Sequence, residues 1–72
     1  MFRLLSDKEF QIATDSRVTV TVYQNNECIG HGFIEMYDLV TVRIYDIHNA
    51  ESAFYVRWAC EFFIENEAAQ VS

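Results

Sequence analysis

Two stretches of the chain alternate strictly between apolar and polar residues. Residues 18–23 read Val-Thr-Val-Thr-Val-Tyr, and residues 40–45 read Val-Thr-Val-Arg-Ile-Tyr. Successive side chains of a strand point to opposite faces, so a period of two is typical of a strand with one buried face. Both stretches are therefore predicted to be β-strands with their aliphatic side chains in the core.

A longer strand is predicted between these two, over about residues 28–36. It contains the only two glycines of the chain, Gly30 and Gly32, near its middle. Glycine inside a strand is typical of a sharp bend, so we expect this strand to be kinked there. Two shorter apolar segments, 53–57 and 61–64, are predicted to be closing strands.

The N-terminal segment predicts a short helix instead. Ser6 followed by Glu9 forms a capping-box pattern, and the helix is expected from about Asp7 to Ala13. Residues 14–17 are predicted to be a turn. The fold class is thus mostly β: a short N-terminal helix and a five-stranded, bent antiparallel barrel over residues 1–64, with an acidic tail over residues 65–72.

Composition restricts the function further. The chain has 72 residues, enough for one domain, and its net charge is −6 from 11 acidic and 5 basic side chains. Because nucleic acids and membrane surfaces are both anionic, this charge disfavours a broad phosphate-tracking surface and peripheral membrane binding. Hydrophobic residues make up 51% of the chain. That is rich for the size and favours either a tight core or apolar surface buried against other chains.

No signal peptide or membrane-spanning run is found in the sequence, so a cytoplasmic location is expected, or a nuclear one in a eukaryote. In that compartment Cys28 and Cys60 would stay reduced. Together with His31 and His48 they are the possible zinc ligands. Cys28 and His31, three apart on one strand, would point to opposite faces, so no metal site is predicted. No nucleophile–base pattern or phosphate loop occurs either, so we expect neither an enzyme nor a cofactor.

One segment matches a family motif without a gap. It runs Gly32-Phe33-Ile34-Glu35-Met36-Tyr37-Asp38, and about twenty residues later comes Tyr55-Val56-Arg57, followed by Phe62-Phe63-Ile64. Both segments resemble the two motifs of the Sm/LSm family, which includes bacterial Hfq. The resemblance covers roughly residues 6–64. It implies an Sm-like barrel, ring-forming assembly and association with RNA.

Single-stranded RNA is the ligand that this resemblance implies. It places Tyr37, Asp38, Arg57 and His31 as the RNA-contact residues. The chain departs from the family at Val40 and Val42, where a stacking side chain and a base-reading asparagine are usual, and at Trp58, which replaces a glycine. Asp38 and Arg57 also have a structural interpretation, as an ion pair or a turn cap.

The sequence therefore predicts two alternative functions. The first is an RNA-associated, ring-forming scaffold or single-stranded RNA binder. The second is a protein-interaction module on the same fold that has lost RNA binding and docks a basic partner through its acidic surface, for example an RNA-handling protein. In the Sm family the fourth strand of one subunit pairs with the fifth strand of the next. A homo-oligomer is expected on this basis, with an interface made by residues of the last two strands: Phe54, Val56, Trp58, Phe62 and Phe63.

Overall fold

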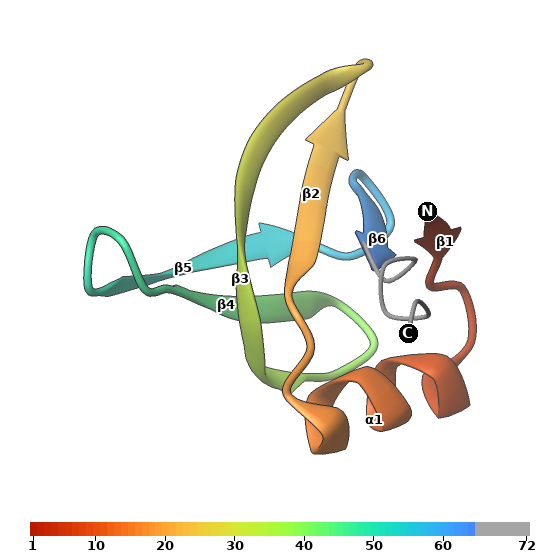
Figure 1. Ribbon diagram of the computed structural model, residues 1–72. Helices are drawn as coiled ribbons and strands as arrows, with labels where there is room; N and C mark the ends of the chain where they lie inside the picture. Colours follow the sequence, from red (N-terminus) through yellow and green to blue (C-terminus); the bar gives the residue numbers. More distant parts are fainter. Residues whose placement is uncertain (65–72) are drawn as a thin grey trace.

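The computed structural model describes residues 1–64; the predicted acidic tail lies outside the described residues. The described part contains one helix and six strands (Figure 1). A mostly β fold with one short helix near the N-terminus is therefore confirmed. In chain order, the elements are β1 (Phe2–Arg3), α1 (Asp7–Ser16), β2 (Val20–Gln24), β3 (Glu27–Tyr37), β4 (Thr41–Asp46), β5 (Glu51–Val56) and β6 (Glu61–Ile64).

All six strands belong to one antiparallel sheet with the order β1-β6-β2-β3-β4-β5. The predicted closure by the last two strands is not observed in the described residues, because β5 pairs only with β4. The reason lies in β6, whose two edges are taken by β2 and by β1. The sequence did not predict β1, which has only two residues and no alternation to reveal it.

The strand β3 bends where the glycines predict. Its first half pairs with β2 as far as Gly32 opposite Val20, and its second half pairs with β4 from Phe33 onward. Gly32 has a φ of 154°, and a Cβ atom there would overlap the carbonyl group of Tyr45. Figure 1 shows β3 curving along the molecule while β4 and β5 run across it. The bend therefore requires a residue without a side chain.

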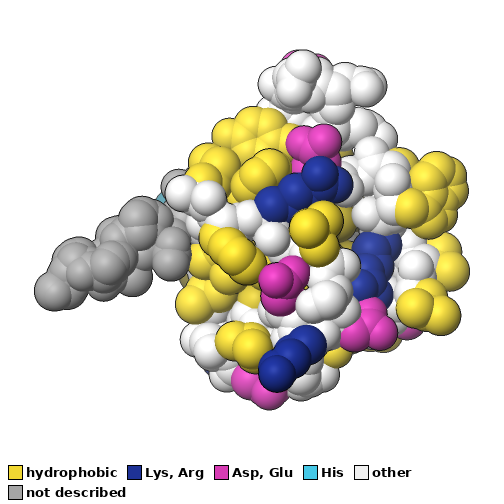
Figure 2. All heavy atoms as spheres, turned by 90° about the vertical axis from the view of Figure 1, so that its right-hand side faces the viewer, with side chains coloured by type: hydrophobic (Ala, Val, Ile, Leu, Met, Phe, Trp, Pro, Cys, Tyr) yellow, Lys and Arg dark blue, Asp and Glu magenta, His cyan; other side chains and the backbone are white. Residues whose placement is uncertain are grey.

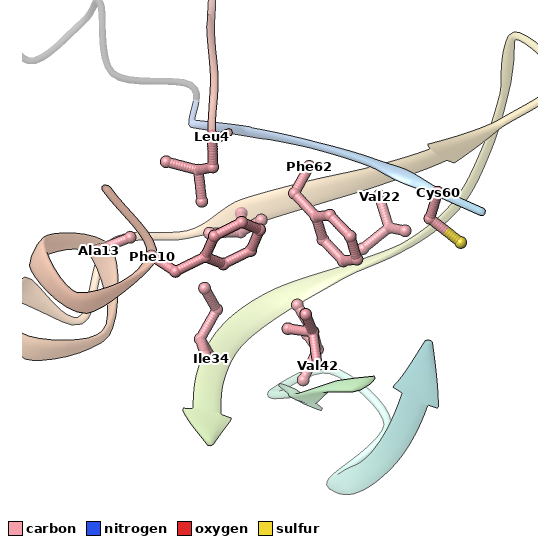
Figure 3. Close-up of a cluster of buried hydrophobic side chains, with 10 residues drawn as sticks. Leu4, Phe10, Ala13, Val22, Ile34, Val42, Cys60 and Phe62 are labelled. Carbon is pink, nitrogen blue, oxygen red and sulfur yellow. The ribbon is translucent and has the colours of Figure 1, made fainter. Parts of the chain in front are cut away.

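The hydrophobic core lies between α1 and the sheet. In Figure 3 the rings of Phe10 from α1 and Phe62 from β6 approach each other at its centre. Their centroids are 5.5 Å apart with an edge-on angle of 72°, a favourable arrangement for two aromatic rings. The buried hydrophobic residues are Leu4, Phe10, Ala13, Val20, Val22, Ile34, Val42, Ile44, Cys60 and Phe62.

The helix is longer than the sequence predicted. Its capping box is present, with Ser6 and Glu9 bonding each other's backbone, but α1 continues through the expected turn to Ser16. The Thr14 hydroxyl donates to the Phe10 carbonyl, which satisfies this polar side chain within the helix. The helix ends at Arg17, which takes the left-handed conformation typical of a C-terminal cap.

Candidate functional site

Asp38 organises the turn between β3 and β4. The backbone N–H groups of Val40 and Thr41 donate to its Oδ1 atom at 2.8 and 2.7 Å. These two hydrogen bonds, from Thr41 first, hold the pKa of the Asp38 carboxyl below its ordinary value. Asp38 thus caps a tight turn, and Val40 lies in that turn instead of in the strand where the alternation placed it.

Arg57 joins the same turn to the helix. Its Nη1 donates to the backbone carbonyl of Asp38 at 2.9 Å, and its Nη2 pairs with Oδ1 of Asp7 at 2.6 Å. Its guanidinium also lies 4.3 Å from the centroid of the Phe10 ring, and its side chain is only 13% exposed. The Arg57 guanidinium is therefore largely engaged by groups of its own chain.

Tyr37 is held in the same cluster. Its hydroxyl donates to Oε1 of Gln11 at 2.6 Å, and its ring lies 5.7 Å from that of Phe10. Three of the four predicted RNA-contact residues therefore come together. Tyr37 and Arg57 are engaged with α1, and Asp38 is joined to them through the bond from Arg57 to its carbonyl. Sequence reasoning missed the helix residues that hold them, because those partners are 26 to 50 residues away in the chain.

His31 lies elsewhere, in the first half of β3 opposite Thr21. It is exposed, and its ring centroid is 5.5 Å from that of His48. Cys28 is exposed whereas Cys60 is buried. Within residues 1–64 no three histidine, cysteine or acidic side chains gather in a group that could hold a metal ion.

The predicted interface residues are divided among several places. Phe62 is 1% exposed in the core, so it does not form the exposed subunit interface that the sequence predicted. Phe63 packs edge-on against Tyr23, at 5.5 Å between ring centroids. Phe54 and Val56 lie on β5 and are 63% and 40% exposed, and Trp58 follows in the turn before β6.

Phe54 and Val56 belong to an unpaired strand edge. The N–H of Arg57 donates to the Val40 carbonyl across the β4–β5 ladder. Because backbone groups alternate in direction along an antiparallel strand, those of Ser52, Phe54 and Val56 point away from β4. The ladder runs without a register shift, so Ser52 and Phe54 offer both their N–H and C=O groups at the free edge. Val56 offers its N–H there, while its carbonyl accepts from the Ala59 N–H at 3.1 Å.

No helix in the described residues is long and apolar enough to cross a membrane. Comparison of the chain with protein-family models, with curated proteins and with solved structures finds no match.

Proposed function

We propose that this protein is a non-enzymatic protein-interaction module that assembles through the free edge of β5. The observation that carries the proposal is the six-residue edge strand with Phe54 and Val56 exposed on it. An unpaired strand edge with apolar side chains is a template for pairing with another chain unless the protein blunts it. Within this edge only Glu51 is charged, and no proline or bulge interrupts it.

An Sm-like architecture is part of this proposal. The resemblance implies that the fourth and fifth barrel strands of one subunit stay apart so that each meets a neighbouring subunit. Their counterparts here, β5 and β6, lie at separate places in the sheet order, and the strand corresponding to the second is the bent β3. Both features support an Sm-like subunit whose barrel is not closed within one chain.

The partner at the β5 edge is proposed to be a second copy of this chain. Head-to-tail pairing would need the outer edge of β6, but β1 lies there: Phe2 is opposite Ile64, and the Leu4 N–H donates to the Phe62 carbonyl at 2.8 Å. Two β5 strands, in contrast, can pair about a two-fold axis without displacing β1. A register centred on Phe54 pairs the two Phe54 residues with each other and Ser52 with Val56 of the second copy, whose carbonyl also accepts from Ala59.

RNA association remains the second prediction, and the geometry favours it less. Arg57, Asp38 and Tyr37 already satisfy their polar groups within the chain. A ligand phosphate or base would have to replace those contacts. The net charge of −6 adds a general repulsion toward a polyanion.

Light scattering at micromolar concentration tests the proposal. We expect a molar mass near twice the 8.4 kDa chain mass. In the two-fold register Phe54→Lys places two like charges opposite each other, so this variant should be monomeric. Ile12→Lys, at an exposed position of α1, is the matched control and should remain a dimer.

A monomeric native protein would refute assembly through β5, and so would a Phe54→Lys dimer as stable as that of the native chain. A mass of several chains would favour the ring instead. The ratio of absorbance at 260 and 280 nm of the purified protein, with titration of a U-rich oligomer at low salt, tests the RNA prediction in the same samples.

A further inference from the structure

A second surface, away from the β5 edge, has the features of a peptide-binding groove. The three most exposed large hydrophobic side chains of the described residues are Trp58, Leu39 and Leu5, at 79%, 78% and 67%. They come from three separate connecting segments, yet all three line one groove of about 240 Å³. Figure 2 shows the face around β1 and the start of α1, where hydrophobic side chains are interleaved with basic and acidic ones.

The base of this groove reaches the hydrophobic core. Phe10, Cys60 and Phe62 line it, and each of them is at most 6% exposed. An apolar side chain inserted there would contact core rings below and exposed leucine and tryptophan side chains around it. Burial of such surface is the main favourable term in association, and tryptophan and arginine are the residues most enriched where binding energy concentrates.

The groove is lined by positively charged side chains, whereas the molecule as a whole carries a negative charge. Two of the five basic residues, Arg3 and Arg57, line it, and no carboxylate does. Arg57 is already neutralised by Asp7. The Arg3 side chain has no hydrogen bond or ion pair within residues 1–64, so its guanidinium is the cation that a ligand would meet. In a chain of net charge −6, this local positive charge selects an acidic ligand.

We propose that the groove binds a short acidic segment of a partner protein. One bulky apolar side chain of that segment enters the groove lined by Leu39 and Trp58, and a carboxylate pairs with Arg3. The aliphatic walls, Leu4, Leu5 and Leu39, suit an aliphatic or aromatic side chain better than a sugar–phosphate backbone. This inference goes beyond the proposed assembly through β5, because it assigns a different surface and a different partner.

The first test is a selection from a phage-displayed library of random peptides with the full-length protein as bait. We expect enriched peptides to have net negative charge and at least one large apolar residue. The enriched peptide is then synthesised without tryptophan and titrated into the protein. Because Trp58 is the only tryptophan of the chain and lines the groove, its fluorescence should change saturably.

Variants then locate the binding site. Arg3→Glu should weaken the peptide about tenfold or more, because it replaces an attractive charge contact with a repulsive one. Arg17→Glu makes the same change in net charge at the other end of α1, outside both the groove and β5, and should leave affinity within about twofold. Leu39→Ser should weaken binding while the unfolding midpoint stays unchanged, since Leu39 is exposed in a turn.

Several results would overturn the inference. They are a selection without enrichment, enrichment of basic peptides, equal effects of Arg3→Glu and Arg17→Glu, or a Trp58 response to a U-rich RNA oligomer and not to the peptide. Failure here is separable from failure of the assembly proposal. Peptide affinity is read from Trp58, whereas assembly is read from molar mass and Phe54→Lys.

Discussion

Arg57 joins three segments that are far apart in the sequence. It lies directly after β5, pairs with Asp7 at the start of α1 and bonds the Asp38 carbonyl in the β3–β4 turn. Its guanidinium lies over the Phe10 ring, so it also covers the core. At this residue the structural interpretation of the motif is the better supported one, although the ion-pair partner is Asp7 and not the Asp38 carboxylate.

Replacing Arg57 with alanine should destabilise the fold by about 2 kcal/mol, since a largely buried cation–π contact and two charge-assisted hydrogen bonds are lost. Urea denaturation followed by Trp58 fluorescence measures this. Arg43→Ala is the matched control. The Arg43 side chain is 42% exposed and pairs with Glu35 at the surface. Its replacement should therefore lower the free energy of unfolding by less than about 1 kcal/mol. Equal losses in the two variants would contradict the structural role of Arg57.

The element that shapes the fold is β3. Among the strands of residues 1–64, only β3 pairs in its first half with one neighbour, β2, and in its second half with another, β4. Register shifts occur in both halves, between Val22 and Tyr23 on the β2 side and between Ile34 and Met36 on the other. Such bulges increase local twist, and with the bend at Gly32 they turn β4 and β5 across the first half of the sheet.

Gly32→Ala should destabilise the protein by roughly 1–3 kcal/mol, because the new methyl group meets backbone atoms of Tyr45 and the φ of 154° is unfavourable for alanine. Gly30→Ala is the comparison. A methyl group there meets the end of the Tyr55 side chain, which can rotate away, so the cost should be smaller. Thermal melts of both variants show which substitution lowers the stability more. A larger loss for Gly30→Ala would argue against the bend at Gly32 as the controlling feature.

At this scale the sequence predicts most of the elements. The alternation at residues 18–23 and 40–45, the bent strand and the capped helix all correspond to observed elements. The errors have local causes. The helix includes Thr14, whose hydroxyl bonds the Phe10 carbonyl, and ends only at the Arg17 cap; β4 begins at Thr41 because Asp38 bonds the turn residues before it. These contacts depend on side-chain geometry that a hydrophobicity pattern does not contain.

The whole molecule is acidic, and several of its carboxylates stabilise turns or helix ends. The pKa of Glu9 is lowered by backbone hydrogen bonds from Leu5 and Ser6, and that of Asp38 by those from Thr41 and Val40. A carboxyl whose pKa is lower in the folded state favours folding while it is charged. That contribution is present above the ordinary pKa values of 4.5 and 3.8 and is lost as pH falls through the folded-state values.

Stability should therefore decrease as the pH falls below about 5. Urea unfolding midpoints are measured at several pH values, in moderate salt that screens the net charge. Their dependence on pH gives the slope of stability against pH. Glu9→Gln with Asp38→Asn keeps acceptor oxygens at both positions but removes their titration, so the double variant should show a shallower slope. An unchanged slope would mean that other groups cause the acid sensitivity.

The sequence by itself determined most of the secondary structure and the bend, because alternation, capping and glycine placement act over a few neighbouring residues. Only the tertiary structure decided which strand edges remain free, since the coverage of β6 by β1 joins residues about sixty positions apart. It likewise gathered Leu5, Leu39 and Trp58 around one groove, and it engaged Arg57 with Asp7. Contacts between distant segments, which no local pattern encodes, thus set the surfaces on which the proposed function rests.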